Sequence, residues 1–236
     1  WICWWQGLEN APEIVKRCVA SIQKHAGHHK IIMITDENYK EFISFPMWIE
    51  EKYKRGIITK THLSDLLRIS LLARYGGVWL DSTFFCTGDL EPCFKTPIWS
   101  IKRPDYRHVS VSCGEFANYS FGCTSEYRKV FAILREYLLD YWKQYDYMID
   151  YLFLDYLIVL ARKQNSCVDQ AFAKIPSNNK NCDELLKVLG IVYNSEDWEN
   201  LKENTTLFKL TWKTDFQKVI DGKSTYLGKM LGGELF

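Results

Sequence analysis

The sequence predicts an α/β fold, and two stretches carry that prediction. Residues 1–36 run from a short apolar segment through an amphipathic one to a second apolar segment, which is the β-α-β order with which doubly wound sheets begin. Residues 61–85, THLSDLLRISLLARYGGVWLDSTFF, combine a helical pattern, two glycines and a buried strand. With 236 residues, 47% of them hydrophobic, the chain is long enough for one domain with a sizeable core.

The other elements follow from apolar periodicity and from the positions of glycine and proline. Strands are expected at residues 1–7, 31–34, 78–80, 98–101, 109–113, 118–122 and 207–212. Helices are expected at residues 12–24, 61–75, 127–144, 147–163 and 183–189, with a short helix and a basic loop within 46–60 and a glycine-punctuated tail at the end.

The helix expected at residues 61–75 presents two faces of different character. Asp65 and Arg68 are three residues apart, so they share an edge and can pair or reach one ligand together. Gly76 and Gly77 fit a left-handed cap at the C-terminal end. The opposite face is a buried stripe made of Leu63, Leu66, Leu67 and Leu71.

Acidic residues follow two of the expected strands. Asp81 comes directly after residues 78–80, and the C-terminal ends of strands are where ligands bind in open α/β sheets. A carboxylate at the end of an apolar strand is costly unless it has a partner or a function. Asp36 follows residues 31–34 in the same way, and both a helix N-cap and a contact to a nucleotide remain open for it.

Two further acids lie in the apolar stretch 147–163, which is expected to be a buried helix. Buried carboxylates at such positions are rarely without a role, so Asp150 and Asp155 are candidate catalytic residues. Five residues apart, they point about 140° away from each other on a helix and cannot form one constellation.

Composition excludes several classes of function. A formal net charge of +1 argues against nucleic-acid binding driven by charge. The eight cysteines are scattered without a CxxC pair, which favours free thiols in a reducing compartment over a zinc site. The five histidines show no metal-ligand spacing with acids, and the first strand–helix turn lacks GxGxxG.

The sequence contains no signal peptide and no run of about 20 apolar residues. It begins at Trp1, inside an expected strand, which leaves an upstream membrane anchor open.

The segments SDLLR (64–68) and YGGVWLD (75–81) resemble the signature of glycosyltransferases with a GT-A fold that use sugar nucleotides. The likeness is greatest to the capsular-polysaccharide-synthesis group and glycosyltransferase family 32, and weaker to the glucosylating clostridial toxins. It extends to WICWWQG (1–7), IDYLFLDYLI (149–158) and KLTWK (209–213).

The resemblance implies a mixed sheet flanked by helices with a helical C-terminal elaboration. It implies a nucleotide-sugar-binding half at residues 1–90 and an acceptor-side half at 91–236. The implied activity is transfer of a hexose from UDP- or GDP-hexose to a saccharide acceptor with retention, in the synthesis of capsule, surface polysaccharide or glycan. The implied location is the bacterial cytoplasm, with peripheral association at the inner face of the membrane, or the Golgi lumen of a eukaryote.

The resemblance also assigns site residues. Asp81 is the principal one. The end of the first strand is implied to bind the base of the nucleotide, and the KLTWK segment is implied to bind its diphosphate. Because neighbours in a strand face opposite sides, only one of Trp4 and Trp5 is expected to touch ligand. The donor-binding residues implied are Trp4, Trp5, Gln6, Asp36, Asp65, Arg68, Asp81, Lys209, Trp212 and Lys213.

A divalent cation, Mn²⁺ or Mg²⁺, is the usual cofactor of this fold and binds an Asp-x-Asp motif. This chain has Asp81-Ser82-Thr83, so Asp81 and Thr83 are the metal-ligand candidates, and a hydroxyl is a poorer ligand than a carboxylate. Weaker metal binding, a carboxylate from elsewhere, and charge stabilisation by Lys209 and Lys213 all remain open.

The missing carboxylate supports one alternative, a catalytically inactive module that binds glycans or nucleotides through a transferase-like fold. A nucleotidyltransferase is disfavoured because the sequence lacks a glycine-rich triphosphate loop.

Overall fold

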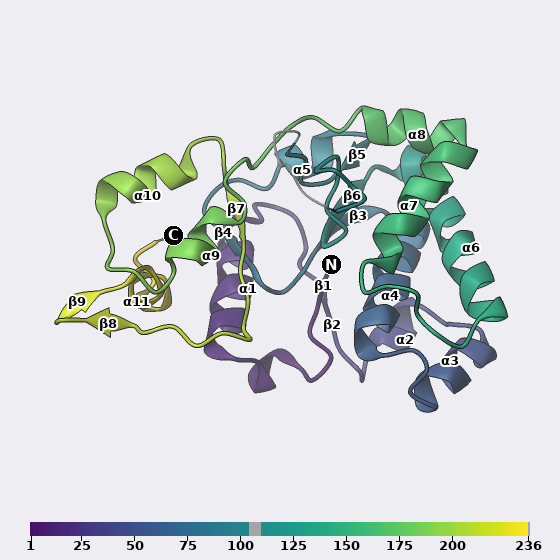
Figure 1. Cartoon of the computed structure of the whole chain (residues 1–236), viewed down its shortest axis with the longest axis horizontal. Coiled ribbons are helices and arrows are strands. Elements are labelled where there is room, and N and C mark those ends of the chain that lie inside the picture. The colour runs from purple at the N-terminus through teal and green to yellow at the C-terminus, as the bar shows by residue number, and fades with distance from the viewer. Residues whose placement is uncertain (104–109, 236) are drawn as a thin grey trace.

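The computed structural model describes residues 1–103 and 110–235, and it confirms a mixed α/β protein (Figure 1). The helices are α1 Glu13–His25, α2 Tyr39–Phe42, α3 Met47–Lys54, α4 Lys60–Tyr75, α5 Pro92–Lys95, α6 Arg128–Gln144, α7 Phe153–Gln164, α8 Ser166–Ala173, α9 Glu184–Val188, α10 Ser195–Lys202 and α11 Tyr226–Gly232. The strands are β1 Ile2–Cys3, β2 Met33–Ile34, β3 Gly77–Leu80, β4 Phe84–Cys86, β5 Ile98–Trp99, β6 Ser120–Cys123, β7 Leu207–Lys209, β8 Val219–Ile220 and β9 Lys223–Ser224.

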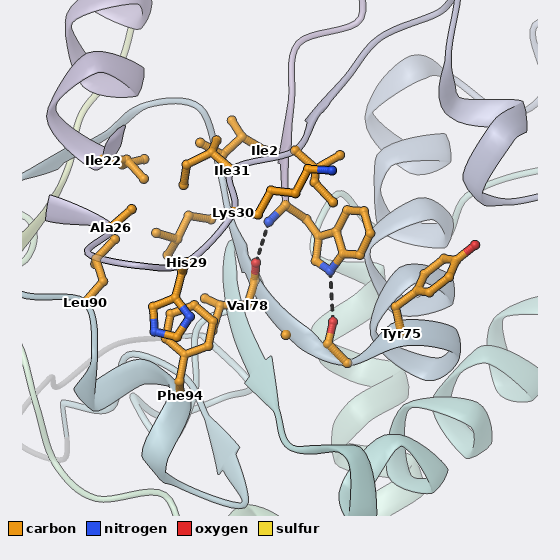
Figure 2. Close-up of a pocket in the computed structure, with 15 residues that line it drawn as sticks. Ile2, Ile22, Ala26, His29, Lys30, Ile31, Tyr75, Val78, Leu90 and Phe94 are labelled. Atoms are coloured by element: carbon orange, nitrogen blue, oxygen red, sulfur yellow. Dashed lines mark hydrogen bonds between the residues drawn. The ribbon is translucent and has the colours of Figure 1, made fainter. Parts of the chain in front are cut away.

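The central strands form one continuous hydrogen-bonded layer. β1 pairs in parallel with β2, and β6 lies antiparallel to both β3 and β5. Trp1 N donates to Val78 O (2.7 Å), as the dashed line to Val78 in Figure 2 marks. Leu80 N donates to Trp1 O (3.1 Å), which completes a parallel pattern that joins β1 to β3. The strand order is therefore β2-β1-β3-β6-β5, and the C-terminal ends of β1, β2 and β3 meet at one edge.

A second small sheet brings the C-terminal part of the chain to this edge. β4 and β7 are antiparallel, with Phe84 opposite Lys209, and Leu210 N donates to Thr83 O (3.0 Å). This pairing places the KLTWK segment beside residues 81–83, more than a hundred residues earlier in the chain.

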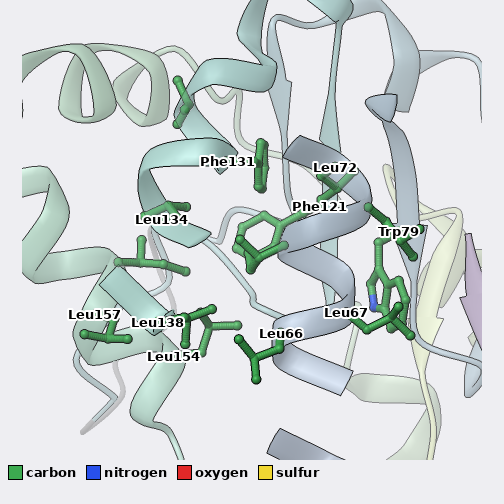
Figure 3. Packing of buried hydrophobic residues seen from close by; sticks show 14 of the residues in the cluster. Leu66, Leu67, Leu72, Trp79, Phe121, Phe131, Leu134, Leu138, Leu154 and Leu157 are labelled. Atoms are coloured by element: carbon green, nitrogen blue, oxygen red, sulfur yellow. The ribbon is translucent and has the colours of Figure 1, made fainter. Parts of the chain in front are cut away.

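Helices cover the strands on two sides. Figure 1 shows α4, α6, α7 and α8 to the right of the central strands and α1 with α9, α10 and α11 to the left. The larger core lies among α4, α6, α7 and the β3–β6 strands, as Figure 3 shows for Leu66, Phe131, Leu154 and Phe121. Each such buried side chain contributes about 1.5–3 kcal/mol relative to exposure. The buried leucines of α4 therefore hold this helix firmly in the core and make it a rigid support for its polar residues.

The ends of α4 are defined by local chemistry. The Thr59 hydroxyl caps the first turn by accepting from His62 N. Gly76 ends the helix with φ +70° and ψ −150°, and Gly77 follows with φ +83°. Both glycines have positive φ as expected, but the ψ of Gly76 is extended and therefore differs from the left-handed helical cap predicted from the sequence.

Several predicted boundaries are wrong. The first strand ends at Cys3 because the chain turns there, with Gly7 N donating to Trp4 O (3.0 Å). Of the strand predicted at 109–113, Val109 lies outside the described residues and 110–113 form turns. The tail is not irregular, because it contains the β8–β9 hairpin and α11.

The stretch 147–163 is helical only from Phe153 onward. Asp150 therefore lies in the loop before α7 and is exposed. Its Oδ1 accepts a hydrogen bond from Leu152 N (2.7 Å), next to the start of the helix. The prediction that Asp150 and Asp155 share one buried helix is wrong for Asp150 and correct for Asp155, which is 6% exposed.

All eight cysteines are free thiols. Among residues 1–103 and 110–235, no helix combines the length and the apolar character needed to cross a bilayer. A small, mostly apolar pocket of about 200 Å³ lies beside Trp1, between α1 and the start of β3 (Figure 2).

Candidate active site

An open cleft of about 460 Å³ lies at the edge where β1 and β3 end. Five parts of the chain line it: the turn after β1, the polar face of α4, the end of β3 with the segment that follows it, the loop before α7, and the end of β7 with the segment that follows it. Of the described residues that line it, four are cationic and one, Asp81, is a carboxylate. The lining residues are Cys3, Trp4, Trp5, Gln6, Lys60, Thr61, Ser64, Arg68, Trp79, Asp81, Ser82, Thr83, Tyr151, Lys209, Leu210, Thr211, Trp212 and Lys213.

Asp81 stands at the centre of a charged network. Its Oδ1 accepts from Trp79 Nε1 (3.0 Å) and lies 3.6 Å from Arg68 Nη2. Its Oδ2 lies 3.4 Å from Lys209 Nζ. A strand residue, a helix residue and a residue from the second sheet therefore hold this carboxylate from three directions.

Arg68 is the buried member of this network, with 5% of its surface exposed. Nη2 lies 3.3 Å from Asp65 Oδ1, Nη1 donates to Asn118, and the guanidinium lies 5.3 Å from the ring centroid of Trp79. Its buried Nε has no hydrogen-bond partner in the described part of the chain. Arg68 is thus fixed in place and retains hydrogen-bonding capacity.

Asp65 lies behind Arg68 and does not line the cleft. Burial raises the pKa of Asp65 to about 6, with a further rise from the Asp81 charge, while Arg68 acts in the opposite direction. The predicted pair Asp65–Arg68 is therefore formed, and Asp65 positions the arginine while the arginine reaches the cleft.

Lys209 reaches Asp81 and Thr83 together. Its Nζ lies 2.5 Å from Thr83 Oγ1, and the ammonium lies 5.4 Å from the ring centroid of Tyr119 and 5.9 Å from that of Phe84. The β4–β7 register produces this arrangement, because Lys209 is opposite Phe84, the residue that follows Thr83.

Aromatic residues form another wall of the cleft. Trp4 and Trp212 meet edge to face with ring centroids 5.7 Å apart. Trp4 Nε1 is buried and unpartnered among the described residues, whereas Trp5 Nε1 donates to Ser64 Oγ (2.8 Å). Since β1 ends before these residues, both tryptophans and Gln6 line the cleft, and the strand alternation used to separate Trp4 from Trp5 does not apply.

The remaining predicted acids lie away from the cleft lining. Asp36 is not the N-cap of α2, a position that Asn38 takes, and it does not line the cleft. Its Oδ2 pairs with Lys60 Nζ at 2.5 Å. Asp155 lines a separate pocket of about 280 Å³ with Asn118. Burial raises the pKa of Asp155 to about 6, although a hydrogen bond with Asn118 acts to lower it. The Oδ1 atom of Asp155 has no hydrogen-bond partner in the described part of the chain. Asp150 lines neither pocket.

Sequence reasoning missed Lys60, Ser64 and Tyr151 in the cleft lining. A signal for the first two was present, because Lys60, Ser64 and Arg68 recur at intervals of four and so share one helix face. No local pattern places Tyr151, which comes from the loop before α7.

A histidine–glutamate cluster forms outside the cleft, although the sequence spacing predicts none. The ligand atoms of His28, His29 and Glu91 lie within 4.8 Å of one another. His29 Nε2 lies 2.9 Å from Glu91 Oε2, and its ring stacks on Phe94 at 3.5 Å (Figure 2). These contacts account for the cluster without an ion.

The fold and the cleft define a mixed α/β protein whose site combines fixed cations, one central carboxylate and a pair of tryptophans. The chain belongs to the family described as capsular polysaccharide synthesis protein, whose sequence model matches residues 1–230. This match confirms the resemblance seen in the SDLLR and YGGVWLD segments.

The chain is also similar to the O-glycosyltransferase PaGT of Phomopsis amygdali, with 31% identity over 90 residues that cover 34% of this chain. The match spans 22% of that longer protein. No solved structure matches. The family and this relative together support a glycosyltransferase role.

Proposed function

We propose that the protein transfers a hexose from a nucleoside-diphosphate hexose to a saccharide hydroxyl, with retention of the anomeric configuration. The observation that carries the proposal is Asp81, held by Arg68 and Lys209 at the end of β3 in a cleft with cations on one side and tryptophans on another. The strand order β2-β1-β3-β6-β5, with β6 antiparallel, supports a GT-A fold for this site.

The donor spans the cleft from the aromatic wall to Asp81. The nucleobase, uracil of UDP or guanine of GDP, stacks at Trp4 and Trp212, and the unpartnered Trp4 indole N–H offers it a hydrogen bond. The diphosphate lies among Arg68, Lys209 and Lys213, where charge-assisted hydrogen bonds to phosphate oxygens are strong.

Transfer rests on positioning and on stabilisation of the leaving group. The acceptor hydroxyl attacks the anomeric carbon on the face from which the diphosphate leaves. Its proton passes to a departing diphosphate oxygen as the sugar–phosphate bond breaks. Cations fixed before the reaction stabilise the charge that develops on that oxygen, and Asp81 holds the hexose hydroxyls in place.

The acceptor is a saccharide of a capsule or other surface glycan, which the family description supports. The acceptor side of the cleft is the one near Tyr151, whose ring is 72% exposed and offers a face for a sugar.

Thermal unfolding with UDP, GDP and their hexose conjugates tests the nucleotide site. A ligand at 100 times its dissociation constant adds about 2.7 kcal/mol to the free energy of unfolding, so one nucleotide should raise the midpoint clearly above the others. Mass spectrometry of the products formed with the matching sugar nucleotide and a panel of saccharides then tests transfer. A chain that is stabilised by no nucleotide and transfers no sugar would instead be a glycan-binding module.

A further inference from the structure

The position between Asp81 and Thr83 already holds a positive charge. Lys209 Nζ lies 2.5 Å from Thr83 Oγ1 and 3.4 Å from Asp81 Oδ2. These two oxygens are the ones that a divalent cation would have to share at the Asp81-Ser82-Thr83 segment. The ammonium therefore contacts both candidate metal ligands.

The other cleft residues do not fit a divalent cation. Mg²⁺ and Mn²⁺ sites depend on carboxylate oxygens, and of the described residues that line the cleft only Asp81 is a carboxylate. The other side-chain oxygens of the lining belong to neutral hydroxyls and to the Gln6 amide. Asp81 is paired with Arg68 as well as with Lys209, so a metal ion would have to displace or approach two cations. Of the nearby acids, Asp36 pairs with Lys60 and Asp65 pairs with Arg68, and neither lines the cleft.

Lys209 is held in position by the fold. Its backbone N donates to Cys182 O (2.8 Å), and β7 pairs it with β4. The side chain is 22% exposed and its ammonium lies over the Tyr119 and Phe84 rings. A donor fixed before the substrate arrives requires no reorganisation when charge develops, so Lys209 can act on a leaving diphosphate as a bound cation does.

We propose that Lys209 is the resident cation of the diphosphate site and that the protein binds and activates its donor without a divalent metal ion. This inference rests on the proposed transfer from a nucleoside-diphosphate sugar. It replaces the Mn²⁺ or Mg²⁺ expected from the GT-A resemblance with a side chain of this protein.

Isothermal titration of UDP and of GDP into the full chain, once with EDTA and once with Mn²⁺, provides the test. The dissociation constant of the nucleotide that binds should agree within about twofold between the two conditions. Lys209→Met should weaken it about 10-fold or more, since a hydrogen bond to a charged group is lost. Lys209→Arg should restore most of the affinity. Lys180→Met, which removes an exposed lysine outside the cleft, is the control.

A second variant tests whether the site can be converted into one that binds a divalent metal ion. Lys209→Met combined with Thr83→Asp recreates an Asp-x-Asp segment and removes the ammonium. This double variant should bind the nucleotide only when Mn²⁺ is present. In a solution that already contains Mn²⁺ and the nucleotide, adding this protein should lower the spin-resonance signal of free Mn²⁺. The wild-type chain should leave that signal unchanged.

The outcomes separate the two proposals. Nucleotide binding that requires Mn²⁺ in the wild type overturns the role of Lys209 and leaves the proposed function standing. Unchanged affinity in Lys209→Met also overturns it. The comparison of EDTA with Mn²⁺ on the wild type decides the question even where a variant fails to fold. Absence of binding by either nucleotide under both conditions overturns both proposals.

Discussion

At the scale of single residues, Asp81 is the side chain on which the candidate site depends. It accepts one hydrogen bond from Trp79 and faces the charges of Arg68 and Lys209. Its importance could be read from the sequence, because the strand pattern and the acid are adjacent there. The identity of its partners could not, since Lys209 is 128 residues away and meets Asp81 only through the β4–β7 pairing.

We therefore expect Asp81→Asn to lower the rate of transfer about 100-fold or more, because it removes the charge that orients both cations and the hexose. The carboxylate is 27% exposed, so the free energy of unfolding should fall by about 1 kcal/mol or less. Initial rates and urea unfolding measure the two effects. Asp197→Asn, an exposed acid of α10, is the matched control, and a fully active Asp81→Asn protein would contradict the assignment.

Asp155 is a different kind of residue, because its charge opposes folding. Its folded-state pKa of about 6 lies above the ordinary value of 3.8. At about pH 3 and below, the carboxyl is largely neutral in both states. As the pH rises from 4 to 6 the unfolded chain loses this proton first, so the free energy of unfolding falls, by about 2–3 kcal/mol once both states are ionised.

Asp155→Asn should remove this fall in the free energy of unfolding at higher pH. We expect the variant to be more stable than the wild type by about 2 kcal/mol at pH 8 and nearly equal to it near pH 3. Urea unfolding at both pH values, under reducing conditions, gives the comparison. Asp65 has the same sign of pKa shift and is present in both proteins, and its charge is one cause of the raised pKa of Asp155. The difference between the proteins therefore reports Asp155 together with its coupling to Asp65. Asp150→Asn, in an exposed loop, is the control, and an equal gain in stability from both substitutions would refute the burial argument.

At the scale of elements, the sequence predicted best those helices and strands whose signals lie within one contiguous stretch. It predicted worst the strands that depend on pairing with distant segments. α4 and β3 match the sequence closely because their periodicity, cap and glycine stop lie within one contiguous stretch. α8 and α10 went unrecognised although Asn165 and Asn194 cap them with side-chain oxygens, a signal that the sequence contained. The short strands depend on partners elsewhere, so their lengths were overestimated.

The junction between α4 and β3 provides a test at this scale. Gly76 combines φ +70° with ψ −150°, and an added Cβ would lie 3.1 Å from Cys123 O. That backbone region is nearly restricted to glycine, so Gly76→Ala should cost about 2–3 kcal/mol in the free energy of unfolding. It should also reduce donor affinity, because the junction sets the position of Asp81 relative to Arg68.

Gly56→Ala is the matched control for this prediction. Gly56 also has positive φ, +74°, but an added Cβ would meet no atom within 4 Å. Its cost should be the backbone strain alone, about 1 kcal/mol. Urea unfolding of the two variants measures how much the unusual backbone of Gly76 and its contact with Cys123 cost together beyond ordinary positive-φ strain. Equal costs would show that neither feature matters.

At the scale of the whole molecule, the cleft is assembled from both halves of the chain. Residues 3–6 and 60–83 supply the strand ends and the helix face, while Tyr151 and residues 209–213 come from the C-terminal half. The family resemblance in the sequence predicted about half of these residues. It did not predict that they share one cleft, because their contacts depend on the packing of α7 and β7 against the central strands.

This arrangement predicts that donor and acceptor affinity can be changed separately. Trp212→Ala removes the aromatic partner of Trp4 and should weaken binding of the nucleoside diphosphate. Tyr151→Ala should leave that affinity unchanged and raise the KM for the acceptor roughly 3- to 10-fold, the loss expected for one stacking contact. Titration calorimetry of the nucleotide and initial rates at varied acceptor concentration measure the two effects.

The loop before α7 supplies its own control. Tyr147 is 60% exposed on the same loop as Tyr151 but does not line the cleft, so Tyr147→Ala should leave both constants unchanged. An equal rise in acceptor KM for the two tyrosine variants would indicate a general effect of the loop and contradict stacking on Tyr151. Weaker nucleotide binding by Tyr151→Ala would instead place the donor on this side of the cleft and reverse the proposed orientation.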